Sequence, residues 1–401
     1  MNDDRHEGAL AGIRVIDAGL LVQGPQAGLT LSDLGADVVK VELPGVGDQA
    51  RWIPISTADP RSPYHVACNR GKRSITLDLR VASAKDAFLR LVRRSDVLLS
   101  NFTPGTLDDW GLGYEALRKV NPRLIYASGS VFGPEGPSAS TKGADLTGQA
   151  AGGLISTTGV DGSDPSPVGA TIADHIASQN MTAGILAAII ARARTGRGQR
   201  VDVSLFGGQI YAQAGEYTHY FLSGQIPGRS NYGHPLLHAA YGIVPTSDGW
   251  LAIVGVPPSE RVAFYAALER PELAYDERFK PPVYTPEVKR ELFAILVEVF
   301  PSRTTAEWCE RLAAAHCRFA RVNDYAQAAN DPHAAINGYI LDVDHPEWGK
   351  VRAVGSPIGL SDTPARPSAV APELGQNTEE VLLELGYTWD DIARLREAGA
   401  I

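Results

Sequence analysis

The feature that most constrains the fold is an alternation of short apolar runs with helical segments over residues 9–128. Residues 13–17 and 38–42 predict buried strands, and Gly24-Pro25 between them places proline where a helix can begin. Further strands are predicted at 73–78, 96–100 and 124–128, helices at 82–93 and 114–120, and a candidate strand at 200–204. Alternating βα units predict a mostly parallel sheet with helices on both faces.

The amino-acid composition changes near residue 222, where Gly, Pro, Ser and Asn predict a linker. Beyond it, residues 241–255 predict a hairpin, and helices are predicted at 259–268, 286–299 and 304–316. A second stretch containing Pro and Gly, 331–372, leads to a closing helix at 378–385. With 401 residues, the chain is expected to hold a large α/β domain and a smaller α+β domain.

Composition excludes several classes of partner. The formal net charge of −9 argues against binding to nucleic acid or to an anionic membrane surface. The three cysteines, Cys68, Cys309 and Cys317, form no CxxC pair, so neither a disulfide framework nor a zinc site is predicted. The polar start of the chain lacks a signal core, and the apolar run 181–191 is too short to span a bilayer. We therefore expect a cytoplasmic protein.

Asp174 stands just before that apolar run, in the segment GATIADH (169–175). The free N–H groups at a helix start can hold a carboxylate in its ionised form, and an ionised, partly desolvated carboxylate is a nucleophile. The segment alone favours a simpler role for Asp174, as a helix cap. The rest of the chain favours the role of nucleophile instead.

The first βα turn has glycines at Gly19, Gly24 and Gly28, which do not fit the GxGxxG spacing of dinucleotide sites. The turn still directs helix N–H groups at any ligand there, and Gln23 could donate a hydrogen bond to it.

Lys72, Arg73 and Arg80 bracket one predicted strand, and Phe102 follows the next. Cations beside an aromatic ring would suit a nucleotide, although each alone is more simply a surface charge. The sequence holds no P-loop, HExxH or EF-hand pattern, so no metal site is predicted.

Together these segments resemble the class III CoA-transferase family, which includes formyl-CoA transferase, carnitine CoA-transferase and acyl-CoA racemases. The matching segments are LAGIRVID (10–17), GADVVKVE (35–42) with Pro44 and Gly47-Asp48, NRGKRSI (69–75), DVL (96–98) with Asn101-Phe102, NPRLI (121–125), TGRGQ (195–199) and EVLLELG (380–386). They occur in order over nearly the whole chain.

The resemblance implies a ring-shaped subunit that forms an interlocked homodimer. Its Rossmann-like large domain would comprise residues 1–221 and, after a return linker, 331–401. A linker and the small domain would occupy 222–330.

It also implies CoA transfer from an acyl-CoA to a free carboxylic acid. The family's catalytic aspartate falls on Asp174, which would form an aspartyl–acyl anhydride and then an aspartyl-CoA thioester. Coenzyme A is then a co-substrate, and no tightly bound cofactor or metal is expected.

By the same likeness, Gln23 has a catalytic role, and Tyr64 and Asp145 fall in the substrate region. Positions that contact CoA fall on Val22, Gln23, Gly24, Leu77, Asp78, Leu79, Arg80, Asn101, Phe102, Thr103, Lys142 and Ala144.

The chain departs from formyl-CoA transferase at two arginine positions, which are Leu43 and Asp109 here. We therefore expect phosphate recognition to rest on Arg80, Lys72 or Lys142. The oligoglycine loop of that enzyme is replaced by NYGHP (231–235), so formyl-CoA and oxalate are not the expected substrates.

The alternative within the family is a 2-methylacyl-CoA racemase or isomerase, which needs acid/base groups on both faces of the α-carbon. The racemase histidine falls on Ala144, which cannot carry a proton. His175 adjoins Asp174 and is assigned a structural or orienting role. A relative that binds CoA without chemistry is a third possibility, against which Asp174 and Gln23 count.

Overall fold

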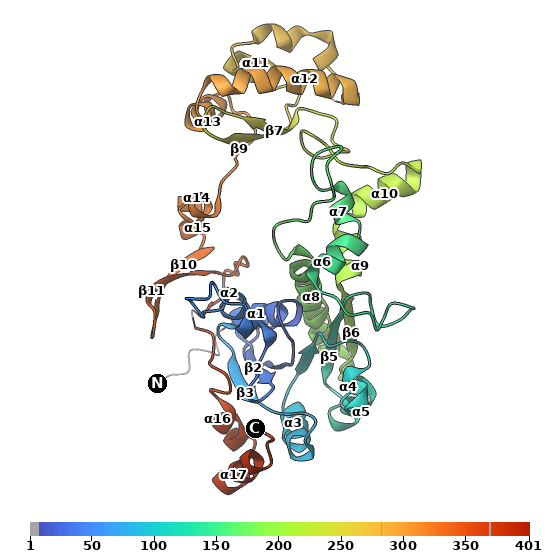
Figure 1. Cartoon of the computed structure of the whole chain (residues 1–401), viewed down its shortest axis with the longest axis vertical. Coiled ribbons are helices and arrows are strands. Elements are labelled where there is room, and N and C mark those ends of the chain that lie inside the picture. Colours follow the sequence, from blue (N-terminus) through green and yellow to red (C-terminus); the bar gives the residue numbers. More distant parts are fainter. Residues whose placement is uncertain (1–7, 282, 369) are drawn as a thin grey trace. The chain divides into compact units, whose positions relative to one another are not determined.

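The computed structural model describes residues 8–281, 283–368 and 370–401, which form two compact units (Figure 1). Unit 1 comprises the chain up to Gly153, then Val168–Ala212 and Pro332–Ile401. Unit 2 comprises Leu154–Pro167 and Gln213–Asp331. The first and the last of the described residues therefore both belong to unit 1.

Unit 1 contains a parallel sheet whose six strands, among the described residues, run in the order β3-β2-β1-β4-β5-β6. The strands are β1 (Arg14–Asp17), β2 (Asp37–Glu42), β3 (Arg73–Thr76), β4 (Val97–Ser100), β5 (Ile125–Ser130) and β6 (Arg200–Ser204). This confirms the predicted α/β fold with a parallel sheet. The strand order reverses between β1 and β4, and ligands bind at such a switch point, beyond the carboxyl ends of the strands.

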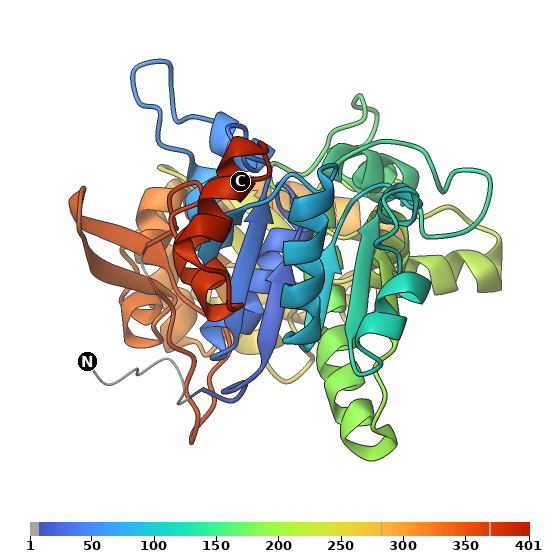
Figure 2. The ribbon, with the colours of Figure 1, turned by 90° about the horizontal axis from the view of Figure 1, so that it is seen from below.

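Side chains alternate across the sheet because successive strand residues face opposite sides. Ile16 belongs to the core under α3, α5, α16 and α17, whereas Val15 belongs to the core under α1 and α8. Figure 2 shows α3 and the C-terminal helices in front of the sheet. The helices are α1 (Gln23–Asp33), α3 (Ala82–Arg93), α5 (Tyr114–Val120), α8 (Ile172–Thr195), α16 (Thr378–Glu384) and α17 (Trp389–Glu397).

Helix α8 places the start of its 24 residues at the carboxyl edge of the sheet, since it runs back toward the turn before β6. Met181 and Ile185 anchor it against the sheet. It ends at Gly196, whose φ of 72° is the left-handed conformation that glycine adopts without strain.

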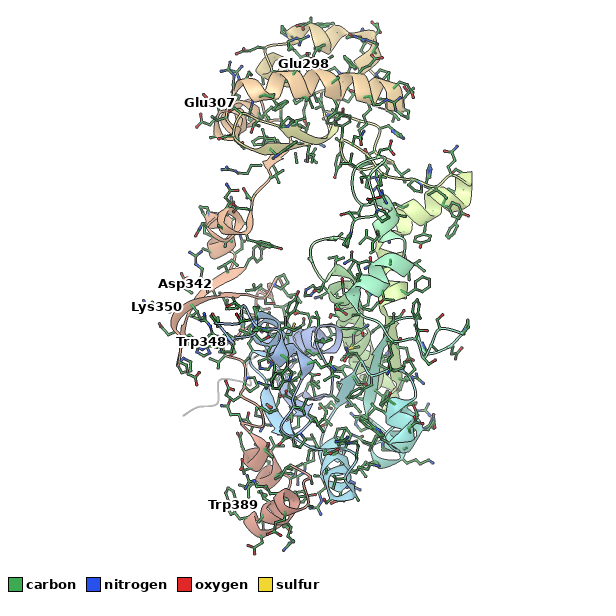
Figure 3. The ribbon with its side chains drawn as sticks, in the orientation of Figure 1. Glu298, Glu307, Asp342, Trp348, Lys350 and Trp389 are labelled. Carbon is green, nitrogen blue, oxygen red and sulfur yellow. The ribbon has the colours of Figure 1, made fainter. Side chains whose placement is uncertain are left out.

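The stretch 331–372, expected as a linker, contains α15 (Pro332–Ile336) and an antiparallel hairpin of β10 (Ile340–His345) and β11 (Gly349–Val354). Trp348 lies at the hairpin turn (Figure 3). It stacks on His345 with ring centroids 3.9 Å apart, and the Arg61 guanidinium lies 5.4 Å from the Trp348 ring. The Arg61 contact ties the hairpin to the loop before α2, whereas the His345 stack lies within the hairpin.

The other elements of unit 1 are short. They are η2 (Gln49–Trp52), α2 (Pro63–Asn69), α4 (Thr106–Asp109), α6 (Asp145–Ala151) and α9 (Leu205–Ala212).

Unit 2 is built on an antiparallel sheet of β7 (Tyr241–Pro245), β8 (Trp250–Val254) and β9 (Phe319–Arg321). Helices α11 (Arg261–Ala267), α12 (Pro286–Val299) and α13 (Thr305–Ala314) enclose an aromatic core around Phe293 and Trp308. The predicted hairpin and α+β character are confirmed. The remaining elements are α7 (Leu154–Thr157), α10 (Ala214–Ser223), η3 (Pro271–Tyr275), η4 (Glu277–Phe279), η5 (Phe300–Ser302) and α14 (Tyr325–Ala329).

Candidate active site

Asp174 lies in the first turn of α8 and is half-buried. Within residues 8–281, 283–368 and 370–401, Asp174 forms hydrogen bonds only through its backbone N–H and carbonyl groups. Its carboxylate has no hydrogen bond and no ion pair there. A partly desolvated carboxylate that is free of partners at the ligand-binding edge of a sheet is available for chemistry.

The start of α8 is capped by Asp145, the first residue of α6. Asp145 Oδ1 accepts the backbone N–H groups of Ala173 at 2.7 Å and of Asp174 at 3.1 Å. The helix N–H groups that were predicted to bind the Asp174 carboxylate therefore donate to another side chain, that of Asp145.

The pKa of Asp174 is raised from its usual 3.8 to about 7. Burial is the main cause, and the negative charge of Asp145 adds to it. The expectation that helix N–H groups hold Asp174 in its ionised form is thus wrong, because Asp145 takes those groups. Asp174 instead titrates near neutral pH, where both its protonation states are accessible.

Gln149, one turn after Asp145 on α6, is almost fully buried and fixes the cap. Its Nε2 donates to Asp145 Oδ2 at 2.6 Å and to the carbonyl oxygen of Ala170 at 3.2 Å. Its Oε1 accepts the N–H of Val168 at 3.0 Å. Gln149 therefore orients Asp145 and the chain leading into α8. Gln149 was not among the predicted site residues, and its only signal in the sequence is the i, i+4 spacing from Asp145.

Gln23 begins α1 after the loop that follows β1, is 3% exposed, and donates from Nε2 to the Ser130 carbonyl at 3.3 Å. Its side chain lies over Gly129 on β5, where any Cβ would come within 2.6 Å of Gln23 Oε1. Ser178 Oγ lies 2.7 Å from the carbonyl oxygen of Gln23 and 2.9 Å from that of Asp174. The hydroxyl of Ser178 thus links the first turn of α8 to the start of α1.

Asn101 follows β4 and clamps the loop that follows β1. Its Oδ1 accepts the Leu20 N–H at 2.7 Å, and its Nδ2 donates to the Leu20 carbonyl at 2.9 Å. Glycine at position 24 leaves room for the close approach of Asn101 to the loop, since a Cβ there would lie 3.3 Å from Asn101 Oδ1. Gln23, Gly24 and Asn101 are therefore brought together at the switch point between β1 and β4.

A family model described as CoA-transferase family III matches residues 10–378. The chain belongs to CoA-transferase family III.

Named relatives match over nearly their whole length. The succinate–glutarate CoA-transferase of Agrobacterium fabrum is 35% identical, covering 94% of this chain and 95% of that protein. The formyl-CoA:oxalate CoA-transferase of Streptomyces coelicolor is 34% identical, covering 98% and 99% respectively. The succinyl-CoA–D-citramalate CoA-transferase of Chloroflexus aurantiacus is 33% identical, covering 99% of each chain. These names and the family indicate CoA-transferase activity.

Solved structures agree in fold. A CAIB/BAIF family protein from Brucella suis superposes with a TM-score of 0.84 at 33% identity, covering 94% of this chain and 99% of that chain. Rv3272 from Mycobacterium tuberculosis gives a TM-score of 0.80 at 30% identity, covering 93% and 98%.

In this family III chain, the segment after β3 alternates buried apolar side chains with a charged pair. Leu77 and Leu79 are buried in the core under α3. Asp78 and Arg80 form a two-point ion pair, with Arg80 Nε and Nη2 each 2.8 Å from an Asp78 oxygen. The Arg80 side chain remains 66% exposed, so its remaining N–H groups face solvent.

Lys72 does not suit phosphate binding, contrary to one expectation. It is buried, and its Nζ lies 2.6 Å from Asp17 Oδ2, 2.7 Å from the Pro25 carbonyl and 2.9 Å from Asn69 Oδ1. Three partners saturate an ammonium group. Lys142, by contrast, is exposed and has no ion pair or hydrogen bond within the part of the chain that the structure describes.

The other predicted positions lie along the same edge or on loops of unit 1. Phe102 packs edge-on against Trp110 at 5.6 Å, and with Thr103 it lines a small cleft beyond β4 and β5. Val22 is buried before α1, Tyr64 on α2 is 37% exposed, and Ala144 is exposed just before α6.

A larger cavity of about 960 Å³ lies at the opposite edge, lined by Arg14 and Gly35 near the amino ends of β1 and β2. Lys72 lines this cavity, but none of the positions that the resemblance assigns to CoA contact does. The described residues contain no group of His, Cys, Asp and Glu suited to a metal, and no helix of theirs is long and apolar enough to cross a membrane.

Proposed function

We propose that this chain moves CoA from an acyl-CoA to a free carboxylic acid through covalent intermediates on Asp174. The observation that carries the proposal is the Asp174 carboxylate itself: partly desolvated, free of partners among the described residues, and with a pKa raised to about 7. Desolvation makes an ionised carboxylate a stronger nucleophile, because fewer water molecules must be displaced before attack.

In the first half of the reaction, an Asp174 oxygen attacks the thioester carbonyl. The carbon–sulfur bond breaks, which gives an aspartyl–acyl anhydride and CoA thiolate. The thiolate then attacks the aspartyl carbonyl, which gives an aspartyl-CoA thioester and releases the donor's carboxylate.

The second half mirrors the first. The acceptor carboxylate attacks the aspartyl-CoA thioester and expels CoA thiolate, which leaves a mixed anhydride. The thiolate attacks the acceptor's acyl carbon, and Asp174 leaves as a carboxylate. Electron pairs and atoms balance without an oxidant, a reductant or a net proton.

Each step builds negative charge on a carbonyl oxygen, and the start of α1 supplies donors for it. The backbone N–H groups of Gln23 and Gly24 have no partner within the described ranges, and Val22 offers no side-chain cap. Such N–H groups can stabilise an oxyanion, as can the second N–H of the Gln23 amide, whose first N–H donates to the Ser130 carbonyl at 3.3 Å. Asp145 we assign to positioning, because both its oxygens are engaged by α8 and Gln149.

CoA is proposed to bind along the carboxyl edge, at Val22–Gly24, 77–80, 101–103, Lys142 and Ala144, with Tyr64 beside the acyl group. A homodimer is proposed as the working assembly. Phe221 and Leu222 on α10 are 73% and 85% exposed, and α10 has no buried residue in this chain. An apolar helix left in water is typical of an interface, and a second copy would cover it.

The proposal is tested by incubating the protein with succinyl-CoA, a donor that appears in the name of the Chloroflexus aurantiacus relative, and a panel of free acids. Formation of a new acyl-CoA that requires an added acid supports transfer. Acid-independent exchange of α-hydrogens with deuterated water, without transfer, would instead support the racemase alternative.

A further inference from the structure

The loop between β1 and α1 holds a non-glycine residue in the left-handed region. Leu21 has a φ of 60°, a conformation that leucine rarely adopts because its Cβ crowds the backbone. Gln23 and the free N–H groups of α1 follow within three residues. The direction in which they point therefore depends on what holds Leu21 in place.

Asp48 holds it. This residue is completely buried just after β2, and its Oδ1 accepts the N–H groups of Leu21 at 2.8 Å and of Ala50 at 2.9 Å. Its own N–H donates to Glu42 Oε2 at 2.8 Å, which fixes the position of the carboxylate.

Lys40 completes the support from β2. It too is completely buried, and its Nζ lies 2.8 Å from Asp48 Oδ2 and donates to the Gly19 carbonyl at 2.9 Å. One buried ion pair thus binds the loop at both Gly19 and Leu21. Burying two charges is costly, and well-packed apolar side chains would stabilise the fold at least as well. The pair is better explained by the geometry that it imposes.

We propose that the buried Lys40–Asp48 pair is a positioning device for CoA transfer, which keeps Leu21 left-handed so that Gln23 and the start of α1 face the reacting carbonyl. This inference rests on the proposed function. Neither Lys40 nor Asp48 touches substrate, so both are positioning residues.

Asp48→Asn tests it with little change in volume. An amide has one acceptor oxygen, so it cannot serve both the Lys40 ammonium and the two N–H groups. We expect kcat to fall roughly 10- to 100-fold, as small misplacements of reacting groups do, with a smaller change in KM. Adding Leu21→Gly removes the crowding that Asp48 opposes, so Asp48→Asn/Leu21→Gly should regain most of the activity of Leu21→Gly alone.

A matched control is Asp33→Asn at the far end of α1, where Asp33 pairs with Arg70 at 2.6 Å, also buried. It should lose comparable stability and keep its kcat. A glycine double variant no more active than Asp48→Asn, or a control with the same loss of kcat, would show that Asp48 acts through stability alone and overturn the inference.

Hydrogen exchange of the peptide spanning residues 18–24 separates this inference from the proposed function. Faster exchange in Asp48→Asn than in Asp33→Asn is expected whether or not transfer occurs. Equal exchange in the two variants would overturn the positioning role, whereas a wild-type protein without transfer activity would contradict the proposed function.

Discussion

The carboxylate of Asp145 caps the helix that carries Asp174: Oδ1 of Asp145 accepts the backbone N–H of Asp174 at 3.1 Å and that of Ala173 at 2.7 Å. Two acidic residues thus meet at one helix start. Asp145 occupies the stabilising donors, and Asp174 experiences both burial and its neighbour's charge. The arrangement keeps Asp174 free and gives it a pKa near neutrality.

Asp145→Asn should shift the acid limb of the pH profile of kcat/KM to lower pH. The amide oxygen can still accept from α8, but the charge that raises the pKa of Asp174 is gone. Burial, the larger cause, remains, so the pKa should not return fully to 3.8. If Asp174 were merely oriented less well, the rate would fall but the midpoint of the acid limb would not move. The midpoint therefore reports the change in the pKa of Asp174. An unchanged midpoint would argue against coupling of the two carboxylates.

Asp174→Asn should abolish transfer while making the protein more stable at pH 8. The folded-state pKa of about 7 lies above the unfolded value, so the folded state loses stability as pH rises toward and through 7. Below about pH 4 both states are protonated and the carboxyl makes no difference. Discounted for partial solvation, the gain in unfolding free energy at pH 8 is on the order of 1–3 kcal/mol. Urea unfolding at pH 4 and pH 8 would measure it; an equal gain at both would contradict the raised pKa.

Gln23→Leu should lower kcat/KM by about 10²-fold through loss of an amide donor beside the reacting carbonyl. Steady-state kinetics with one donor and one acceptor would measure the change. Gln26→Leu, one turn further along the same helix, is the matched control and should remain close to wild type. If the two variants behaved alike, the role proposed for Gln23 would be wrong.

Lys142→Gln should raise the KM for an acyl-CoA by roughly 3- to 10-fold at low salt, with kcat unchanged, if its exposed ammonium contacts a CoA phosphate. Lys350→Gln on the exposed hairpin is the control for net charge. A thioester of pantetheine, which lacks the nucleotide, should show the same KM with Lys142→Gln and wild type. A rise in KM for that substrate as well would point away from phosphate contact.

Local patterns predicted the strands of the parallel sheet and several of its helices closely, because these elements pack against the buried core. The amphipathic spacing in α3 and α5 defined both helices to the residue, at Ala82–Arg93 and Tyr114–Val120. The hairpin β10–β11 was missed within a stretch rich in Pro and Gly, since its residues contribute to no buried core cluster.

The site was harder to predict because its contacts join residues far apart in sequence. Asp145 caps a helix that begins 27 residues later at Ile172, and no local pattern signals such a cap. In the sequence Lys72 resembles an ordinary surface charge. In the structure it is buried against Asp17, which is 55 residues away along the chain. Resemblance to relatives supplied the candidate site residues, and the packing of the chain shows how their side chains are held.

The most direct test is intact-protein mass spectrometry after mixing with succinyl-CoA without an acceptor, with and without hydroxylamine, followed by peptide mapping. The account predicts a hydroxylamine-sensitive adduct on the wild-type protein that maps to Asp174 and is absent from Asp174→Asn. A wild-type protein that transfers CoA with no adduct at Asp174, or an adduct that maps to another residue, would contradict it.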